Sequence, residues 1–389
     1  MKKQPYSGPI LVVAGTRPEV IKLAPVYLEA RNRLGGARVC WVSTGQHEEL
    51  ERETLARFAI KPDHCLNAGA GGALLNLNEK VVRGITALCE AIDPALAIVQ
   101  GDTVSAFAGA FAAFHQHLPV AHVEAGLRSG DNRDPFPEEA YRRMIDDMAS
   151  LRFAPTPGAA ANLVAEGCRE DTIFVTGNTA IDALALVDKL AAPCAPANVP
   201  VIPNGQRLVF VTLHRRESWG TKLDGMCRAL RDIVERFDDI HVVLPLHVNP
   251  RVRETVEPIL RDQPRITLTE PLDYAACHSL IRTAHLILTD SGGIQEEAPS
   301  YHVPVLVLRD VTERPEAVRD GLAVLVGTDR QDVYSIASRW LDDPALRAGM
   351  QGIDNPFGDG QAATRIVTAL ERFLTGKTPL LTNCEQFSR

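Results

Sequence analysis

The stretch LILTDSGGIQEEAPS, residues 286–300, decides the fold of this chain because it joins an apolar run to a helix through two glycines. Its first four residues predict a buried strand, and the stretch from Ile294 onward predicts a helix. Ser291 is placed to cap that helix, and Gly292 and Gly293 let a ligand approach its first N–H groups. Because such N–H groups and the helix dipole attract anions, the turn predicts a phosphate site. The simpler alternative is a turn that needs glycine for its geometry alone.

A carboxylate one turn inside this helix extends the prediction from phosphate to nucleotide. Glu297 follows Gly293 by four residues and can accept hydrogen bonds from a ribose diol. Other nucleotide motifs are missing from the sequence. There is no G-x-x-x-x-G-K-[ST], and NAGAGGALL, residues 67–75, lacks the third glycine of a dinucleotide fingerprint. We therefore expect a nucleotide ligand and no cofactor.

Composition and charge indicate a soluble enzyme. The chain has 389 residues, 45% of them hydrophobic, which suits two domains with substantial cores. A formal net charge of -8 argues against nucleic acid or an anionic membrane as a partner. No apolar run is long enough to span a membrane, and the start MKKQPYSGPI lacks the apolar core of a signal peptide. The eight cysteines form no C-x-x-C pair and no cluster with histidine, so we expect reduced thiols, a cytoplasmic location and no metal.

Short apolar runs alternate with helical stretches along both halves of the chain. The expected strands are Ile10–Ala14, Val39–Ser43, Ala95–Val99, Val120–Val123, Leu151–Ala154, Ile173–Val175, Leu208–Thr212, His241–Leu244, Ile266–Leu268, Leu286–Leu288, Val305–Val307 and Ala323–Val326. Strands separated by helices form parallel sheets. The sequence therefore predicts an α/β protein with two doubly wound parallel sheets.

One segment interrupts the alternation. Residues 191–206 contain four prolines and no apolar period, which predicts a linker. This places a first domain at residues 1–190 and a second at 207–358. Ligands of parallel sheets bind at the carboxyl ends of the strands, and with two domains we expect the site in the cleft between them.

Cations follow the first expected strand. In GTRPEVIK, residues 15–22, Arg17 and Lys22 stand near a helix N-terminus, where two cations can clamp a diphosphate. For Arg17 alone, a surface turn with solvated charges is the simpler interpretation.

Carboxylates follow other strands of the first domain. Asp102 lies in QGDT, Glu124 in HVEAGLRSGD, and Glu138 or Glu139 in PFPEEAYRR. Taken singly, each fits a helix cap, as Asp102 does, or a surface ion pair. Because a carboxylate facing a cleft is costly unless it is paired or reactive, the set predicts acid–base chemistry. We expect Glu139 to matter less than Glu138 if it points to solvent.

The second domain offers cations and imidazoles at strand ends. His214 and Arg215 lie in VTLHRRESWG, His247 and Asn249 lie in LPLHVNPRV, and Arg314 lies in DVTERPEA. A lone histidine at such a place is more often a packed, hydrogen-bonded residue than a catalyst. Together with the phosphate turn, the set predicts a bound nucleoside diphosphate.

These motifs together resemble the non-hydrolysing UDP-N-acetylglucosamine 2-epimerases. The resemblance covers almost the whole chain through GTRPEVIKLAPV, STGQH, QGDT, HVEAGLRSGD, PFPEEA, FAPT, VTGNTAIDAL, LHRRES, HVNPRVRE, LTDSGGIQEEAPS, RDVTERPEAV and NPFGDGQAATRI. It implies two Rossmann-like domains in the GT-B arrangement, a homodimer, and a C-terminal helix at residues 359–376 that packs on the first domain. It also implies that the second domain binds UDP while the amino sugar lies in the cleft.

The resemblance also implies a reaction. The C2 proton of the sugar has no neighbouring carbonyl to acidify it, so inversion proceeds by elimination of UDP across C1–C2 to a glycal and re-addition on the other face. UDP-N-acetylglucosamine and UDP-N-acetylmannosamine are then interconverted without a nicotinamide. By motif match, the resemblance implies acid–base chemistry for Asp102, Glu124 and Glu138. It implies stabilisation of the leaving phosphate by His214 and Arg17, with support from Lys22. It also implies binding of phosphate and ribose by Ser291, Gly292, Gly293 and Glu297, with Arg314, His247 and Asn249 nearby.

The chain departs from the family pattern at several positions. Glu48 and Glu49 stand where regulated members carry groups that bind a second UDP-sugar as activator, and Tyr141 replaces an asparagine. Cys277 replaces an aromatic residue that contacts uracil, and Leu272 stands where a polar residue is common. Four alternatives therefore stay open: an epimerase of UDP-2,3-diacetamido uronic acids, a hydrolysing epimerase, a GT-B glycosyltransferase and a nucleotide-sugar binding protein without activity.

Overall fold

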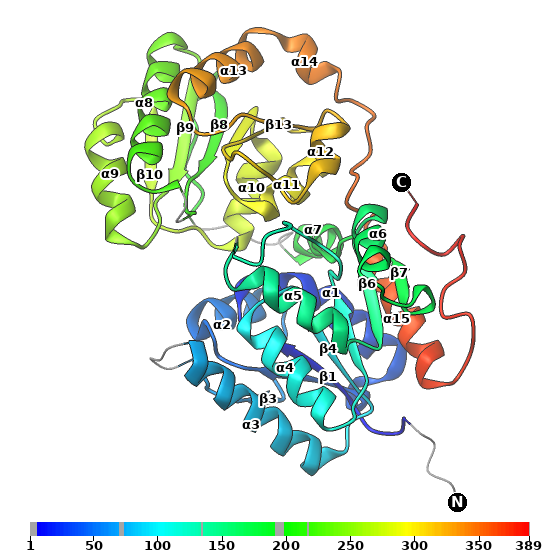
Figure 1. Ribbon diagram of the computed structural model, residues 1–389. Helices are drawn as coiled ribbons and strands as arrows, with labels where there is room; N and C mark the ends of the chain where they lie inside the picture. Colours follow the sequence, from blue (N-terminus) through cyan, green and yellow to red (C-terminus); the bar gives the residue numbers. More distant parts are fainter. Residues whose placement is uncertain (1–5, 70–73, 134, 191–197, 216–217, 389) are drawn as a thin grey trace, which may run out of the picture. The chain divides into compact units, whose positions relative to one another are not determined.

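A computed structural model describes residues 6–69, 74–133, 135–190, 198–215 and 218–388 (Figure 1). The chain forms two compact units. Unit 1 comprises Met1–Leu190 and Phe357–Arg389, and unit 2 comprises Ala191–Pro356. The predicted linker at residues 191–206 falls in unit 2, and its first seven residues, 191–197, lie outside the described part. Among the described residues, no helix is long and apolar enough to cross a membrane.

Unit 1 is built on a seven-stranded parallel sheet with the order β3-β2-β1-β4-β5-β6-β7. Its strands are β1 (Ile10–Ala14), β2 (Val39–Ser43), β3 (His64–Cys65), β4 (Leu96–Gln100), β5 (Val120–Val123), β6 (Leu151–Ala154) and β7 (Ile173–Val175). The strand order runs outward in both directions from the β1–β4 pair, as a doubly wound sheet requires. The predicted α/β architecture is therefore confirmed here, while β3 was not predicted because it carries no apolar run.

The helices of unit 1 are α1 (Arg17–Leu34), α2 (Glu48–Arg57), α3 (Leu74–Ile92), α4 (Val104–His115), α5 (Glu138–Met148), α6 (Pro157–Ala165), α7 (Thr179–Leu190) and α15 (Ala362–Leu374). Leu11 and Val13 of β1 pack with side chains of α3 and α4 in one core cluster. Small residues let α4 lie close to the sheet, since a Cβ on Gly109 would stand 3.1 Å from Val13 Cγ1. The other main group of helices is formed by α1, α7 and α15, which contact one another.

The end of the chain returns to unit 1 through α15 (red in Figure 1). The side chain of Asp182, on α7, accepts hydrogen bonds from the N–H groups of Ala362 (3.2 Å) and Ala363 (2.9 Å). These two donors are among those that a helix N-terminus leaves without an intrahelical partner. Asp182 therefore anchors the start of α15 to α7.

Unit 2 is built on a six-stranded parallel sheet with the order β10-β9-β8-β11-β12-β13. Its strands are β8 (Arg207–Thr212), β9 (Ile240–Pro245), β10 (Ile266–Thr269), β11 (Leu286–Thr289), β12 (Val305–Val307) and β13 (Ala323–Leu325). Its helices are α8 (Thr221–Arg236), α9 (Pro250–Leu260), α10 (Tyr274–Thr283), α11 (Gly292–Glu297), α12 (Pro315–Arg319), α13 (Arg330–Asp342) and α14 (Pro344–Ala348). The second predicted doubly wound parallel sheet is thereby confirmed.

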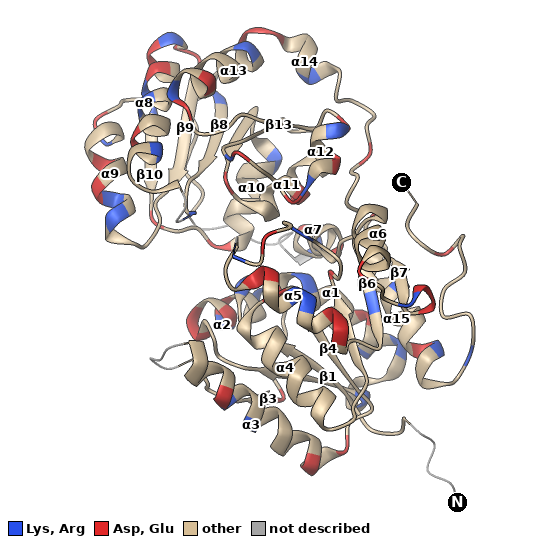
Figure 2. Ribbon diagram, in the orientation of Figure 1, with Lys and Arg blue, Asp and Glu red and all other residues tan. Residues whose placement is uncertain are grey.

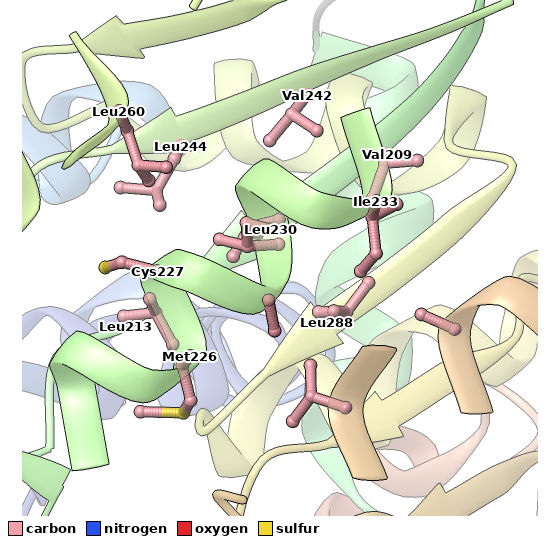
Figure 3. Close-up of a cluster of buried hydrophobic side chains, with 14 of the residues drawn as sticks. Val209, Leu213, Met226, Cys227, Leu230, Ile233, Val242, Leu244, Leu260 and Leu288 are labelled. Atoms are coloured by element: carbon pink, nitrogen blue, oxygen red, sulfur yellow. The ribbon is translucent and has the colours of Figure 1, made fainter. Parts of the chain in front are cut away.

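The core of unit 2 lies where α8 covers its sheet. Leu230 and Ile233 of α8 pack with Val209 of β8, Val242 of β9 and Leu288 of β11, and all five are buried (Figure 3). Burial of each such side chain contributes about 2 kcal/mol to folding. Acidic and basic residues cover the solvent side of α8 and α9 (Figure 2), in pairs such as Arg228–Asp224 on α8. Exposed pairs of this kind are worth about 0.5 kcal/mol each, so apolar packing is what holds the sheet and helices together.

Candidate active site

The carboxyl ends of β4 and β5 bring two of the predicted carboxylates together. Gln100, the last residue of β4, pairs with Val123, the last residue of β5. The turn that carries Asp102 and the residue Glu124 therefore leave the sheet side by side. Their closeness is visible at Gly101, where a Cβ would lie 3.5 Å from Glu124 Oε2.

Glu124 has both an unusual backbone and a dense set of donors. Its φ of 67° lies in the left-handed region, which is costly for a residue with a side chain and is frequent at functional sites. Lys22 Nζ and Gln100 Nε2 donate to its two carboxylate oxygens, and Asn178 Nδ2 donates to Oε1 from 3.3 Å. The side chain is only 9% exposed. Three segments of unit 1 thus fix one carboxylate at the end of a strand.

Asp102 does not cap α4, which the sequence had offered as one explanation for it. The N-cap is Thr103, whose hydroxyl accepts a hydrogen bond from the N–H of Ala106 at 3.1 Å. Arg142, from α5, donates instead to Asp102 Oδ2, with Nε at 3.0 Å and Nη2 also in contact. With 28% of its side chain exposed, Asp102 is reachable by a ligand while an arginine holds its orientation.

The two glutamates that open α5 have opposite environments. Glu138 is partly exposed, whereas Glu139 is fully buried. The expectation that Glu139 points to solvent is wrong, because its carboxylate accepts the N–H groups of Ser129 (3.0 Å) and Gly130 (3.3 Å) and lies 3.1 Å from Arg142 Nη1. Glu139 therefore orders the loop before α5, and Glu138 is the glutamate of this pair that a substrate can reach.

The β1–α1 turn has a buried carboxylate that the sequence interpretation missed. Arg17 is the partly exposed first residue of α1, and Glu19, two residues on, is fully buried. Glu19 accepts hydrogen bonds from the N–H of Gly15 (3.0 Å) and from the hydroxyls of Thr16 (2.8 Å) and Thr103 (2.6 Å). Burial raises the pKa of Glu19 to about 7. The carboxyl group ties the turn after β1 to the turn after β4.

In unit 2, the aligned ends of β8 and β11 bring His214 beside an aspartate. Thr212 pairs with Thr289, so the residues that follow both strands meet. His214 Nδ1 lies 2.8 Å from Asp290 Oδ1, and Asp290 Oδ2 accepts the N–H groups of His214 (2.8 Å) and Arg215 (2.9 Å). Burial alone would raise the pKa of Asp290, but His214 and the two N–H groups hold it below its usual value. The ionised aspartate orients the imidazole, and Nε2 faces away from it.

The glycine turn after β11 behaves differently at each of its three residues. Ser291 stands at the N-cap of α11, but its side chain makes no capping hydrogen bond, so that part of the prediction is wrong. The Oγ1 of Thr289 accepts the N–H of Ser291 instead, at 2.9 Å. A Cβ on Gly292 would lie 2.6 Å from the guanidinium carbon of Arg314, whereas one on Gly293 would meet open space. Gly292 therefore admits Arg314 to the turn, and Gly293 leaves room for a ligand.

Two neighbouring glutamates on α11 are held by different partners. Arg314 Nε donates to Glu296 Oε1 at 2.6 Å, and this contact fixes the guanidinium beside Gly292. The hydroxyl of Tyr274, from α10, donates to Glu297 Oε1 at 3.3 Å. Burial, together with the charge of Glu297, holds the pKa of Tyr274 well above its usual value, so the hydroxyl keeps its proton and stays a donor. Tyr274 therefore orients the carboxylate predicted to bind ribose.

The remaining predicted binding residues of unit 2 have mainly local contacts. His247 Nδ1 accepts the N–H of Asn249 at 3.1 Å, and Asn249 Oδ1 caps α9 by accepting the N–H of Arg251 at 3.0 Å. Because Nδ1 accepts, the ring proton of a neutral His247 is on Nε2. Leu272 is buried and Cys277 is partly exposed on α10. The contact with Asn249 therefore makes neutral His247 a donor through Nε2. The side chain of Leu272 offers a ligand no polar group.

The structure adds site residues that the sequence interpretation did not single out. They are Glu19, Gln100, Arg142, Asn178, Tyr274 and Asp290. Gln100 lies two residues before Asp102, and Asp290 directly precedes Ser291, so attention to every polar residue beside a strand end could have found them. Over the described residues, no group of three or more His, Cys, Asp or Glu side chains is placed to hold a metal ion.

Known proteins resemble this chain over almost its whole length. A family model described as UDP-N-acetylglucosamine 2-epimerase matches residues 29–371. The UDP-N-acetylglucosamine 2-epimerase of Escherichia coli K12 is 44% identical over 93% of this chain and 98% of the relative. That of Bacillus subtilis is 43% identical over 93% and 94%, respectively. The crystal structure of UDP-GlcNAc 2-epimerase from Neisseria meningitidis bound to UDP-GlcNAc superposes with a TM-score of 0.88 at 37% identity, over 94% of this chain and all of that one. The chain therefore belongs to the UDP-N-acetylglucosamine 2-epimerase family.

Proposed function

We propose that this protein interconverts UDP-N-acetylglucosamine and UDP-N-acetylmannosamine. A base removes the C2 proton while the C1–O bond breaks and UDP departs, and a glycal is left. UDP then re-adds at C1 while a proton returns to the opposite face of C2. Each atom removed in the first half-reaction is restored in the second, so no oxidant, reductant or metal is consumed.

The observation that carries this proposal is Glu124. Its left-handed backbone and its three donors hold a carboxylate in a single orientation beside the Asp102 turn. A structural ion pair has no need of that strain, whereas proton transfer depends on a fixed distance to the carbon. Asp102 and Glu138 are the further acid–base candidates, because both are partly exposed.

The groups of unit 2 suit the departing UDP. His214 offers Nε2 as a donor while Asp290 holds the other side of the ring, so a positive imidazolium can stabilise the charge that develops on the phosphate. Arg314 and Arg215 are arginines held by Glu296 and by the backbone of Asp290, a preorganisation that suits diphosphate. Ser291, Gly293 and Glu297, with His247 and Asn249, are proposed to contact phosphate and ribose.

Incubation with UDP-N-acetylglucosamine in D2O tests the proposal. We expect deuterium at C2 in both epimers, with the bond to UDP intact in the product. Release of free N-acetylmannosamine would indicate hydrolysis instead, and absence of exchange would leave glycosyl transfer or simple binding. Running the same test with a UDP-2,3-diacetamido uronic acid distinguishes the sugar. The family resemblance also predicts a homodimer, which light scattering of the purified protein measures.

A further inference from the structure

A buried histidine links the segments that carry Asp102 and Glu124, two of the three carboxylates proposed to transfer protons. His122 is on β5, two residues before Glu124, and its side chain is completely buried. Its Nε2 lies 2.8 Å from the carbonyl oxygen of Gly101, the residue before Asp102. Its Nδ1 lies 2.6 Å from Oδ1 of Asp146, on α5. One imidazole thus joins the turn after β4, the strand β5 and the helix α5.

The partners of His122 fix the direction of both hydrogen bonds. A carbonyl oxygen can only accept, so Nε2 donates to Gly101. Burial alone would raise the pKa of Asp146, but His122 and Arg128 hold it below its usual value, so its carboxylate is also an acceptor. Both ring nitrogens therefore donate, and the ring cannot turn without losing one of its bonds.

Asp146 anchors the histidine to the loop that follows Glu124. Its Oδ2 accepts from the N–H of Gly126 at 3.3 Å and from Arg128 Nη2 at 2.7 Å. Arg142, which lies on α5 one turn before Asp146, donates to the carboxylate of Asp102. The turn that carries Asp102 is thus held at its carboxylate by Arg142 and at the preceding carbonyl by His122.

We propose that His122 is a positioning residue, which sets the backbone of the Asp102 turn against Glu124 through the hydrogen bond to Gly101. This inference rests on the proposed epimerase function for its kinetic consequence. A residue of this kind affects the chemical step through the placement of another group, and a misplacement of about 1 Å can lower the rate about 100-fold. Because the His122 side chain is completely buried, we expect the affinity for the nucleotide to be independent of it.

Two substitutions separate the two hydrogen bonds of the ring. His122→Gln places an amide N–H where Nε2 stands, and so keeps the donor to Gly101. His122→Asn places one where Nδ1 stands, and so keeps only the contact with Asp146. We expect His122→Asn to lower kcat about 100-fold with KM unchanged, while His122→Gln retains most of kcat. Equal kcat values for the two variants would overturn the inference, because the proposed role belongs to the hydrogen bond from Nε2 to Gly101.

A matched control is His241, which is buried in unit 2 between Gln206 (3.0 Å from Nδ1) and Thr267 (2.7 Å from Nε2). His241→Asn and His241→Gln report the general cost of replacing a bridging histidine, and both are expected to keep kcat. A fall in kcat for His241→Asn as large as for His122→Asn would also overturn the inference. If His122→Asn fails to fold, Asp146→Asn takes its place: we expect a lower kcat at unchanged KM, and an unchanged kcat would contradict the role.

Crystal structures of the variants separate this inference from the proposed function. We expect the Gly101 carbonyl and Asp102 to move in His122→Asn and to stay in place in His122→Gln. If the wild-type protein fails to exchange deuterium at C2, the proposed function is wrong. The positioning role is then tested only by whether the Gly101 carbonyl and Asp102 move in His122→Asn. Unchanged backbones in both variants would reject it.

Discussion

At the scale of single residues, the position of Glu124 directly after a strand was predictable, and its hydrogen-bond partners were not. A carboxylate directly after an apolar strand stands out in the sequence, because strand ends of parallel sheets face ligands. Its partner Lys22 lies 102 positions away, and no local pattern links the two. The sequence placed Lys22 near a diphosphate, while in the structure it donates to Glu124. Pairings at such separation depend on the tertiary fold.

The carboxylates give the first prediction. We expect Asp102→Asn, Glu124→Gln and Glu138→Gln each to lower kcat by about two to four orders of magnitude, the usual contribution of general acid–base groups. The affinity for UDP, measured by calorimetry, is expected to change little. Wild-type kcat in two of the three variants would remove the carboxylate mechanism. Glu139 cannot serve as control because it is buried, so the exposed Glu90→Gln takes that place.

The aspartate beside His214 gives the second. Asp290→Asn keeps an oxygen for the N–H groups of His214 and Arg215 but removes the charge that supports an imidazolium. We expect kcat to fall about 100-fold, as for loss of one group that stabilises developing negative charge. His214→Ala is expected to lower kcat at least as far. If Asp290→Asn changes only the thermal stability, the aspartate serves the backbone alone.

At the scale of elements, the strands were easier to predict than the loops. Apolar runs such as Ile10–Ala14 are visible in sequence because strands buried on both faces are continuously hydrophobic. The turn after β11 was only partly predicted: Ser291 does not cap α11, and the role of Gly292 depends on Arg314, which comes from the segment after β12. Patterns within one element predict its type, whereas contacts between turns are set by the sheet register.

The buried carboxyl group of Glu19, which joins the β1–α1 turn to the β4–α4 turn, makes the stability of the folded protein depend on pH. The pKa of Glu19 is about 7 in the folded protein, above its usual 4.5. Because the folded state binds the proton more tightly, this contribution to stability is complete below pH 4.5 and is lost as the pH rises to 7. Urea unfolding should show Glu19→Gln gaining on the order of 3 kcal/mol relative to wild type between pH 4.5 and pH 8. If the free energies of unfolding of the two proteins differ by the same amount across that pH range, burial does not raise the pKa of Glu19.

The start of α2 bears on regulation. Glu48 and Glu49 lie exposed in its first turn, close after the STGQH motif. Carboxylates repel a diphosphate at short range, so they disfavour a second UDP-sugar there. The neighbouring GAGGA stretch, residues 69–73, supplies no arginine that could compensate, and its residues 70–73 lie outside the described part. We expect hyperbolic kinetics in both directions. A reverse reaction with no measurable rate until a trace of UDP-N-acetylglucosamine is added would contradict this expectation. The double variant Glu48→Lys with Glu49→Gln tests whether the two carboxylates are what repels a second UDP-sugar.

At the scale of the whole molecule, α15 joins the last part of the chain to the unit that contains its beginning. Ile366, Val367 and Leu370 are fully buried, and the helix contacts α1 and α7. Leu370→Ala should therefore lower the free energy of unfolding of unit 1 by about 2–5 kcal/mol. Thr364→Ala, exposed on the same helix, is the control and should have little effect. Thermal denaturation measures both variants, and a loss for Leu370→Ala as small as that for Thr364→Ala would show that α15 is dispensable for unit 1.

This connectivity also sets an order of events at the ribosome. Residues 357–389 leave the exit tunnel only after the whole of unit 2 has been synthesised. Unit 2 is continuous in sequence and can complete its sheet while unit 1 still lacks α15. Unit 1, most of which is made first, is therefore finished last, because the layer of α1, α7 and α15 is complete only after residues 362–374 have been synthesised.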